Sequence, residues 1–431
     1  MSEGTSPATR SVTLTARRRW GLFALLMVAG ILNYVDRQIF AVLQEPISRD
    51  LTLTTNQYAD LAGAFLWSSA IAFLFVGWII DRIGIRRSNP LGVAAWSLAA
   101  LAHGWASSFT SFFLARAALG ATEAMGTPNQ IKTVATLFPP SLRSLGFGLG
   151  NMVGSVGAIV TPMVVPAFAL VYGWRAAFIV AGVLGLVWTL VWLAATRRTD
   201  LSGEADDARR TPASLRATIE GIRVILADRT SWGIAVAKVL SDSTWWFLLF
   251  WMPRFLQNQY HLELKQIGLP LAIAYSGAAI GSVVAGSASS LLLSRGWSID
   301  RTRKTSMLVS ALLVLPVPAV LWMTDYWLVA VMLAVALAGH QGFSTNLFAL
   351  IADVTPTARV ARVTSFAAFC GNVGGFGIQK AAGWVLTAGL GYAPLFAFAA
   401  VSYLLALGWI QLLLPHIRPV GGPRPAAALH H

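Results

Sequence analysis

Charged residues are scarce in this sequence of 431 residues: Asp, Glu, Lys and Arg make up 12% of it, whereas 56% of it is hydrophobic. Soluble domains carry about 25% charged residues, so the composition excludes a water-soluble fold. Three stretches without any charged residue have the length of about 20 residues that crosses a bilayer as a helix; they are 61–80, 176–196 and 305–324. The sequence therefore predicts many membrane-spanning helices and no separate soluble core.

Cysteine is nearly absent as well, because Cys370 is the only one, and a disulfide within the chain is impossible. The sequence shows no His and Cys spacing typical of a metal site and no pairing of a nucleophile with a base. We therefore expect no metal, no cofactor and no enzyme activity. The final Ala-Ala-Ala-Leu-His-His resembles the remnant of a purification tag, so its histidines carry no argument for a metal.

The formal net charge of +14 follows a membrane topology rather than a nucleic-acid surface. Lys and Arg concentrate in the N-terminus, in the connections that follow every second predicted span, and in the C-terminus. The opposite connections hold only Arg49, Arg175, Arg254 and Lys265. By the positive-inside rule, we expect both termini in the cytoplasm. The basic connections either serve topology alone or also contact anionic membrane lipid.

Twelve spans are predicted, as two halves of six helices that are built from three-helix units. The expected spans are 19–43, 57–80, 88–108, 110–136, 143–171, 175–195, 231–257, 266–294, 304–324, 326–352, 361–388 and 393–415. The expected parts of the chain are a polar, disordered tail over 1–16 that is not a cleaved signal, an N-terminal half over 17–196, a cytoplasmic linker over 197–230, a C-terminal half over 231–416 and a tail over 417–431. In the linker, Leu215, Ile219, Ile222 and Ile225 recur at helical spacing, which favours a short amphipathic surface helix.

Strongly polar side chains lie at membrane depth on the first, fourth, seventh and tenth predicted spans. They are Asp36, Arg37, Arg116, Glu123, Lys132, Lys238, Asp242, His340, Gln341 and Asn346. An ionisable group in hydrocarbon costs about 2.5–3.5 kcal/mol even on insertion scales, so such groups face a water-filled cavity or one another. A period of three spans indicates that each three-helix unit sends one helix to a shared polar cavity, which is the plan of a secondary transporter.

Asp36 and Arg37 on the first span, with Arg116 and Glu123 on the fourth, suit the chemistry of an anion carrier. Arginine offers a planar, bidentate fork for a carboxylate. A carboxylate that is paired with arginine stays ionised, and one that loses its partner in a desolvated site takes a proton. These residues also fit two purely structural ion pairs, Asp36 with Arg116 and Glu123 with Arg37, which is the less favoured interpretation because intramembrane charge is usually functional.

Other polar residues leave their roles open. Lys238 and Asp242 stand four residues apart and favour a structural ion pair. Lys132 either faces the cavity or extends to the lipid headgroups. His340 is either a hydrogen-bonded contact between helices or a ligand or proton site. Trp246 either stacks on a sugar ring or belongs to the interfacial aromatic belt.

The connection between the second and third spans carries the most specific motif of the chain. It reads Gly77-Trp-Ile-Ile-Asp81-Arg82-Ile-Gly84-Ile-Arg86-Arg87 and resembles the signature loop of the major facilitator superfamily. Basic side chains would explain positive-inside anchoring but not the spacing of Gly, Asp, Arg and Gly. The resemblance implies that a cluster of four residues gates the carrier by holding one conformation and releasing it in another; these are Asp81, Arg82, Arg86 and Arg87.

Further motifs resemble the anion:cation symporter family within that superfamily. They are Asn33-Tyr-Val-Asp36-Arg37 and Arg116-Ala-Ala-Leu-Gly-Ala-Thr-Glu123. Others resemble its branch of bacterial hexuronate transporters, namely Ile131-Lys132-Thr-Val-Ala-Thr-Leu-Phe-Pro139, Ala237-Lys238-Val-Leu-Ser-Asp242-Ser-Thr-Trp245-Trp246-Phe and His340-Gln341-Gly-Phe-Ser-Thr-Asn346-Leu-Phe348. The resemblance covers about residues 20 to 415 and implies the all-α fold of the superfamily, with twelve transmembrane helices.

The resemblance also implies residue roles. The Arg37 position holds a substrate carboxylate, Tyr34 adds a hydroxyl, and Asp36 and Glu123 couple transport to protons. The other residues that we expect to bind substrate are Arg116, Asn151, Ser155, Trp246, His340, Gln341, Thr345, Asn346, Phe348 and Asn372. In two places the chain departs from its relatives: Ser69 replaces a usual tyrosine, and Asp242 precedes serine where relatives often have proline.

We therefore expect a proton-coupled symporter that imports an organic anion, with a hexuronate or related sugar acid as the favoured substrate. It is expected to work as a monomer in a bacterial inner membrane, by rocking of the two halves, with membrane lipid and protons as its other partners. Three alternatives stay open: a proton-coupled exporter of drugs, whose site should be net acidic or apolar, a symporter for a different carboxylate, and a non-transporting sensor or membrane enzyme.

Overall fold

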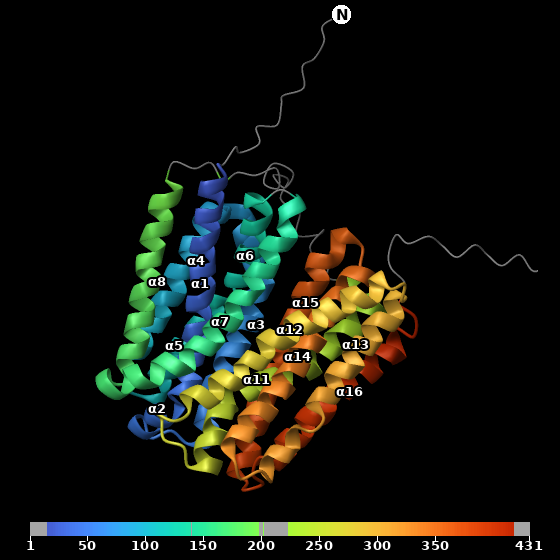
Figure 1. Cartoon of the computed structure of the whole chain (residues 1–431). Helices are drawn as coiled ribbons and strands as arrows, with labels where there is room; N and C mark the ends of the chain where they lie inside the picture. Colours follow the sequence, from blue (N-terminus) through green and yellow to red (C-terminus); the bar gives the residue numbers. More distant parts are fainter. Residues whose placement is uncertain (1–14, 139, 198–200, 202–222, 418–431) are drawn as a thin grey trace, which may run out of the picture. The chain divides into compact units, whose positions relative to one another are not determined.

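A computed structural model of the chain describes residues 15–138, 140–197, 201 and 223–417. The predicted tails and most of the predicted linker, with Leu215, Ile219 and Ile222, lie outside the described residues. Within these ranges, the regular structure consists of helices alone (Figure 1). The fold is therefore all-α, as the sequence predicts.

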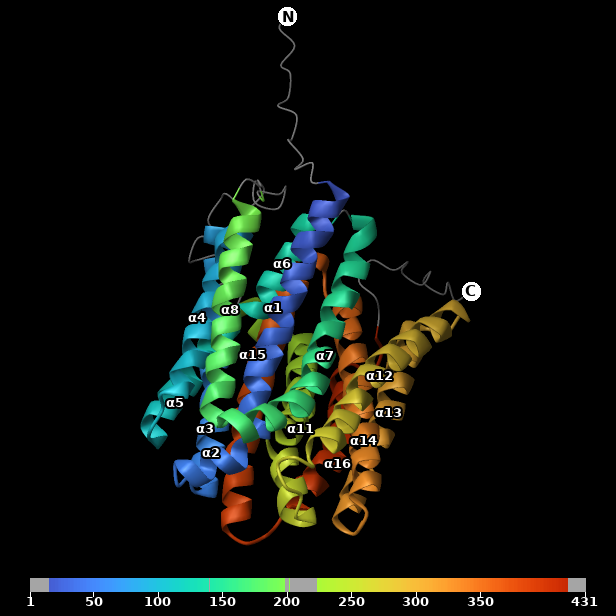
Figure 2. The same ribbon diagram turned by 60° about the vertical axis from the view of Figure 1, so that its left-hand side comes forward.

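The chain forms two compact units. Figures 1 and 2 colour their helices from blue near the N-terminus to red near the C-terminus. The first unit contains α1 (Ala16–Val42), α2 (Gln44–Asp50), α4 (Ile85–Gly104), α5 (Phe109–Glu123), α6 (Gly126–Leu137), α7 (Pro140–Tyr172) and α8 (Trp174–Thr196). The second contains α11 (Arg229–Tyr260), α12 (Gly268–Ser294), α13 (Ile299–Val314), the 3₁₀-helix η1 (Val317–Leu321), α14 (Tyr326–Val354), α15 (Thr357–Thr387) and α16 (Ala393–Leu413). The long helix α3 (Thr55–Ile83) is divided, because Leu53–Leu66 groups with the second unit and the rest of it with the first.

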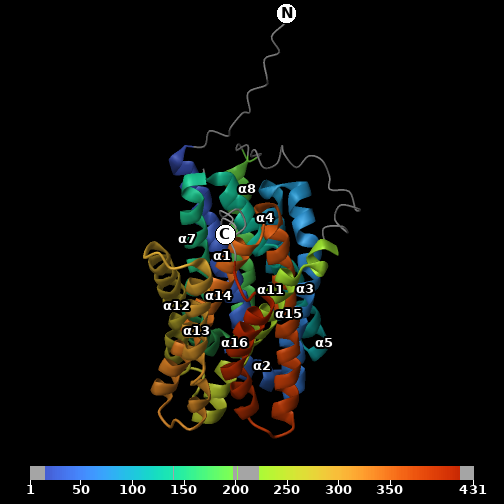
Figure 3. The same ribbon diagram turned by 90° about the vertical axis from the view of Figure 1, so that its right-hand side faces the viewer.

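Each of the twelve predicted spans corresponds to one helix or to a pair of consecutive helices. Nine helices in the described part of the chain are apolar enough and long enough, with at least 18 residues, to cross a membrane. Within the first unit α1 packs along α7 and α4 along α8, and within the second α12 packs along α14 and α11 along α15 (Figure 3). The protein is a multi-pass membrane protein.

Two predicted spans are broken rather than continuous. The span expected over 110–136 ends as α5 at Glu123 and resumes as α6 at Gly126. Pro128 explains this break, since proline has no N–H to donate to the carbonyl of Ala124 and its ring clashes with that carbonyl. The span expected over 304–324 likewise changes from α13 to η1 around Pro316. The first break decides where the acidic side chain of Glu123 lies.

Within the second unit, the first part of α3 makes polar contacts with α11 and α15. Tyr58 donates a hydrogen bond of 2.6 Å to the carbonyl of Phe250 on α11, and Arg254 donates one of 2.8 Å to the hydroxyl of Thr55. Lys380 on α15 forms an ion pair with Asp60. These contacts explain why the beginning of α3 groups with α11 and α15.

Candidate functional site

A buried ion pair joins α1 and α5 in the first unit. The Nε of Arg37 lies 2.5 Å from Oε2 of Glu123, and the side chain of Glu123 has no exposed surface. A short, charge-assisted hydrogen bond of this kind is among the stronger polar contacts in proteins. Because the pair connects two different helices, it can be exchanged for another partner when either helix moves or either group changes its charge.

The backbone around Glu123 makes this pairing important. Glu123 is the last residue of α5, and the carbonyl end of a helix carries a partial negative charge that disfavours a carboxylate. The helix break at Pro128 places it there. The positive charge of Arg37, which also donates a hydrogen bond, offsets both this dipole and the loss of water, and the charge of Arg116 adds to it.

A second acid and a second arginine complete the cluster. Asp36 and Arg116 are buried, with 1% and 0% of their surface exposed, and Asp36 interacts electrostatically with Arg37, Glu123 and Arg116. The guanidinium of Arg116 lies 4.5 Å from the ring centre of Phe40. The structure thus brings together four of the five charged residues that the sequence singles out on the first and fourth spans. The fifth, Lys132, donates a hydrogen bond of 3.3 Å to the carbonyl of Ile80.

Both carboxylates keep an unused oxygen. Oδ1 of Asp36 and Oε1 of Glu123 are buried and have no hydrogen-bond partner among the described residues. A buried acceptor without a donor costs about 1–3 kcal/mol. Protonation converts such an oxygen into a hydroxyl and removes its charge, so the cluster has the chemistry of a proton site.

A cavity of about 70 Å³ lies beside this cluster, between α1, α4, α6 and α7. Tyr34 and Arg37 line it, as the sequence predicts for a substrate site. Glycines on α7 make room for the tyrosine: a Cβ atom at Gly154 would lie 2.6 Å from the ring of Tyr34, and one at Gly157 would lie 2.6 Å from its Cβ. The tyrosine ring itself lies with its centre 5.4 Å from Cζ of Arg37.

One wall of the cavity is fixed by hydrogen bonds between α4 and α6. Asn89 donates to the carbonyl of Ile85 and to the hydroxyl of Thr133, both at 2.9 Å. Asn129 accepts from the hydroxyl of Ser88 and donates to its carbonyl. Three of these hydrogen bonds join α4 to α6, so the wall that they form is a firm support for the cavity.

Six residues with polar side-chain atoms line this cavity but were not predicted from the sequence; they are Asn33, Asn89, Trp96, Thr127, Asn129 and Gln130. One of them could have been found from its spacing, because Asn33 lies four residues before Arg37 and therefore on the same face of α1. The other five come from α4 and α6, and their position follows from how these helices pack.

Three further predicted positions in the first unit lie apart from the cavity or cannot be placed. The side chain of Asn151 lies outside the described residues, and Ser155 is half-buried on α7 without lining the cavity. Ser69, where relatives have tyrosine, is buried and donates a hydrogen bond of 2.8 Å to the carbonyl of Gly120 on α5.

The signature loop forms the turn between α3 and α4. Gly84 precedes α4 with φ of 71°, a conformation that glycine adopts without strain. Arg86 donates a hydrogen bond of 2.9 Å to the carbonyl of Arg197, Arg82 lies 5.3 Å from the ring centre of Trp78, and Arg87 is exposed. The side chain of the fourth predicted gate residue, Asp81, lies outside the described residues.

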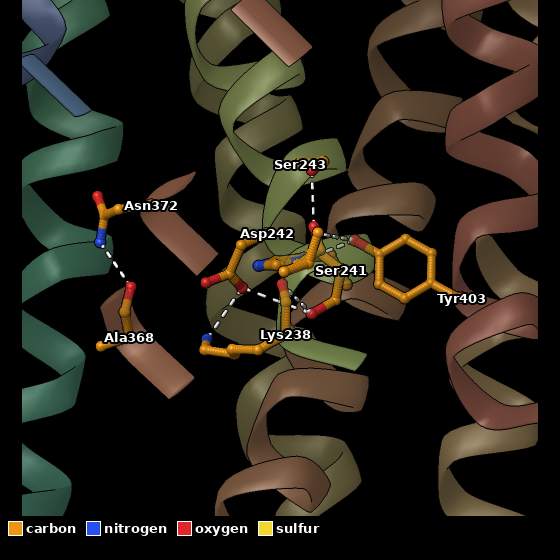
Figure 4. A network of polar contacts seen from close by, with 9 residues as sticks. Lys238, Ser241, Asp242, Ser243, Ala368, Asn372 and Tyr403 are labelled. Carbon is orange, nitrogen blue, oxygen red and sulfur yellow. Dashed lines mark hydrogen bonds and ion pairs between the residues drawn. The ribbon is translucent and has the colours of Figure 1, made fainter. Parts of the chain in front are cut away.

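The second unit holds a polar network of its own, centred on α11 (Figure 4). Nζ of Lys238 lies 2.9 Å from Oδ1 of Asp242 one turn further along the same helix, and 4.7 Å from the ring centre of Phe348. Next to this pair, the hydroxyl of Tyr403 donates a hydrogen bond of 3.1 Å to the carbonyl of Ser241. The contact between Lys238 and Asp242 fits the structural ion pair that their spacing of four residues favours.

His340 takes part in this network as a contact between helices. Its Nδ1 lies 2.6 Å from the hydroxyl of Tyr403 on α16, and its ring stacks on Trp245 of α11 with centres 4.9 Å apart. Trp246 is also packed tightly, since its ring stacks on Phe250 with centres 5.9 Å apart. His340 therefore joins helices of the second unit, and Trp246 does so through the ring of Phe65 on α3, whose centre lies 6.3 Å away.

The other predicted residues of the second unit differ in exposure. Asn346 is buried, donates to the carbonyl of Gly342 and lies 3.5 Å from Arg303, which pairs with Asp353. The amide of Asn372 donates to the carbonyl of its own helix at Ala368 (Figure 4). Three residues keep more accessible surface; they are Gln341, Thr345 and Phe348.

Among characterised proteins, several bacterial transporters resemble the chain over most of its length. The D-galactonate transporter of Escherichia coli O6:H1 is 25% identical over 426 residues, which cover 94% of this chain and 97% of the relative. The probable L-galactonate transporter of Escherichia coli K12 is 31% identical over 362 residues, with 80% and 79% covered. The hexuronate transporter of Escherichia coli K12 is 25% identical over 404 residues, with 90% and 92% covered.

Solved structures share the fold. The inward-open xylose transporter of Escherichia coli superposes with a TM-score of 0.72 at 12% identity, covering 94% of this chain and 97% of that one. An inward-facing, occupied bacterial homologue of the human lysosomal transporter Spinster superposes with a TM-score of 0.73 at 17% identity, covering 93% and 98%. The family model of the Major Facilitator Superfamily matches residues 26–377. The protein belongs to the major facilitator superfamily and is a transporter rather than an enzyme.

Proposed function

We propose that this protein is a proton-coupled symporter that imports a sugar acid, a hexuronate or a related aldonate, across a bacterial inner membrane. Its relatives are named as transporters of D-galactonate, L-galactonate, hexuronate and galacturonate. In this proposal the protein acts as a monomer with both termini in the cytoplasm, and it exposes its site alternately to each side.

The observation that carries the proposal is the buried pair of Arg37 and Glu123, with Asp36 and Arg116 beside it. An arginine in a low-dielectric site binds a carboxylate well only if its own counter-ion gives way. When Glu123 takes a proton, its charge is gone and the guanidinium of Arg37 becomes available to the substrate. Proton binding and anion binding then favour each other, which is the thermodynamic condition for symport.

The other residues take supporting parts in this proposal. Tyr34 and Arg116 contact the substrate in the first unit, together with Asn151 and Ser155. In the second unit, the more accessible side chains contact the rest of the substrate, and the buried ones hold them in place. The accessible ones are Gln341, Thr345 and Phe348, and the buried ones are Trp246, His340, Asn346 and Asn372. The gate is formed by Asp81, Arg82, Arg86 and Arg87.

The test is uptake into liposomes that contain the purified protein. Counterflow of a panel of sugar acids identifies the substrate without a driving force, and an imposed pH gradient, alkaline inside, then tests coupling. We expect counterflow of at least one hexuronate or aldonate and its accumulation under the gradient. Proton flux stimulated by organic cations instead of carboxylates would identify a drug antiporter, and sugar-acid binding without uptake would identify a sensor.

A further inference from the structure

The cavity between α1, α4, α6 and α7 is unusually rich in hydrogen-bond donors. Among the described residues that line it, Arg37 is the one charged side chain, and Asp and Glu are absent. The carboxylates of the cluster therefore do not compete within the cavity itself. A cavity that is lined by a positive charge and by no negative one favours an anion over a cation or a neutral group.

Asn33 and Trp96, which line this cavity, each hold a buried donor without a partner among the described residues. Nδ2 of Asn33 and Nε1 of Trp96 make no hydrogen bond to any described residue, and their residues are only 7% and 3% exposed. The neighbouring amides of Asn89 and Asn129, on the same wall, have partners for their NH₂ groups. A buried N–H without an acceptor costs about 1–3 kcal/mol, so the unsatisfied pair indicates that an acceptor comes from outside the chain.

The size of the cavity limits what that acceptor can be. One water molecule needs about 10–15 Å³ of such a cavity's volume, so a cavity of about 70 Å³ has room for a group of a few atoms. This volume suits a carboxylate group with its two oxygens. It is too small for the whole carbon chain of a six-carbon sugar acid, which has to remain outside it.

We infer that this cavity is the subsite for the carboxylate end of the substrate, where Asn33 and Trp96 donate hydrogen bonds to the oxygens that Arg37 neutralises. The inference rests on the proposed function and extends it, because neither residue belongs to the site that the sequence predicts. Both are positioning and specificity residues: Arg37 supplies the charge, and the two neutral donors fix the direction in which the carboxylate enters. They select a carboxylate over an alcohol at the same end of the sugar.

The chain offers a matched control for Trp96. Trp188 lies in the same unit and is also buried, but its Nε1 donates a hydrogen bond of 2.7 Å to the carbonyl of Leu25. Replacement by phenylalanine removes the N–H and keeps an aromatic ring in both positions. If both tryptophans are purely structural, both variants bind the ligand as the wild type does. If Trp96 contacts the ligand, W96F weakens binding without loss of stability, whereas W188F loses stability without weaker binding.

The experiment measures binding and thermal unfolding of the full chain in detergent. D-galactonate, L-galactonate, D-glucuronate and D-galacturonate are titrated first, and the tightest ligand is compared with its neutral alditol. We expect W96F to raise the Kd of the acid at least about tenfold without lowering the Tm of the unliganded protein, because no hydrogen bond within the protein is lost. W188F should lower that Tm and change the Kd less than twofold.

A second variant provides a test if W96F misfolds. Together with R37K it also distinguishes failure of the proposed subsite from failure of the proposed function. N33L removes the other donor at similar volume and should also weaken the acid while leaving its alditol unaffected. If R37K loses binding but W96F and N33L both bind the acid as the wild type does, the subsite is wrong and the proposed function stands. If none of the acids binds the wild type, or R37K binds normally, the proposed function fails and the subsite fails with it.

Discussion

The two units each bury a pair of opposite charges, but the pairs differ in how they are built. In the first unit, Arg37 and Glu123 come from α1 and α5, and Glu123 keeps one oxygen without a partner among the described residues. In the second, Lys238 and Asp242 lie one turn apart on α11, and the ammonium also faces the ring of Phe348. A pair within one helix moves as a unit, whereas a pair between two helices can open.

The surroundings of the two pairs differ in the same way. Asn33 and Trp96, close to the first pair, hold donors that no described residue satisfies, whereas His340 and Tyr403, close to the second, are bonded to each other. A fully satisfied polar network makes a structure rigid, and an unsatisfied one is costly unless a ligand or a proton completes it. We infer that the first unit performs the chemistry of transport and that the network of the second is a scaffold.

Charge-preserving exchanges of the two cations should give the largest contrast. R37K keeps the charge but loses the planar fork that pairs with a carboxylate. We expect the Kd for the sugar acid to rise about 100-fold or more, which corresponds to about 2.7 kcal/mol. The converse variant, K238R, should bind within about threefold of the wild type. Isothermal titration in detergent measures both.

The control for this pair of variants is thermal unfolding without ligand, which should show both proteins folded. A Kd that rises in K238R as much as in R37K would contradict the comparison, because it would make the lysine of α11 an equal partner in binding the anion.

Neutral replacements of the two acids should separate coupling from stability. E123Q resembles the protonated state, so we expect it to support counterflow but to lose accumulation driven by a pH gradient. The wild type, with one proton for each monoanion, should accumulate substrate about tenfold for each pH unit. D242N should keep that accumulation and instead lower stability by about 3 kcal/mol, because it leaves a buried lysine without its counter-ion.

Uptake into liposomes and chemical denaturation measure these two properties independently. D36N serves as the second test of coupling, and we expect it to behave as E123Q does or to lose transport when the carboxylate also orients Arg37. Full accumulation in both E123Q and D36N, with loss of it in D242N, would reverse the roles that we assign to the two units.

The fold could be predicted closely from the sequence because the signals for spans are local. Charge-free stretches of sufficient length and a regular distribution of Lys and Arg determine spans without any knowledge of packing. The two helix breaks were missed although Pro128 and Pro316 are visible in the sequence. Proline is tolerated inside membrane helices when neighbouring groups satisfy the freed carbonyl, so its presence alone does not locate a break.

The candidate site was predictable only in part, and for a related reason. Charged residues such as Asp36 and Glu123 stand out in apolar spans, and the family motifs name them. A neutral residue such as Trp96 does not stand out, because tryptophan is common in membrane proteins at the interface. Its N–H becomes informative only in the packed structure, where no described residue accepts a hydrogen bond from it.

Replacement of a glycine by alanine in each unit should also distinguish the units, with smaller changes in Kd and stability than the charge variants give. In G154A the new Cβ atom would lie 2.6 Å from the ring of Tyr34, so this ring, which lines the cavity, has to move. We expect the Kd of the sugar acid to rise about fivefold to tenfold, since overpacking costs about 1–3 kcal/mol. G371A should crowd the carboxylate of Asp242, which lowers stability by a similar amount without changing the Kd.

Gly377 provides the control for the substitution itself, because a Cβ atom there would meet nothing within 4 Å. Its replacement by alanine should stabilise the helix by about 0.4–1 kcal/mol. An unchanged Kd in G154A would show that Tyr34 does not border the bound substrate.

The smallest effect concerns His340, the one histidine in the polar network of the second unit. Its hydrogen bond to Tyr403 and its stacking on Trp245 join three helices. If this role is structural, H340Q should lower the free energy of unfolding by about 1 kcal/mol and leave the pH dependence of transport unchanged. A double-mutant cycle with Y403F should then give a coupling energy of about 1 kcal/mol, because both variants remove the same bond. Denaturant unfolding of the four proteins measures the coupling energy. Uptake between pH 5 and pH 8, where an unperturbed histidine titrates, measures the pH dependence of transport. A pH profile that shifts in H340Q while E123Q keeps its accumulation would place a proton site in the second unit and remove the distinction between a working unit and a scaffold.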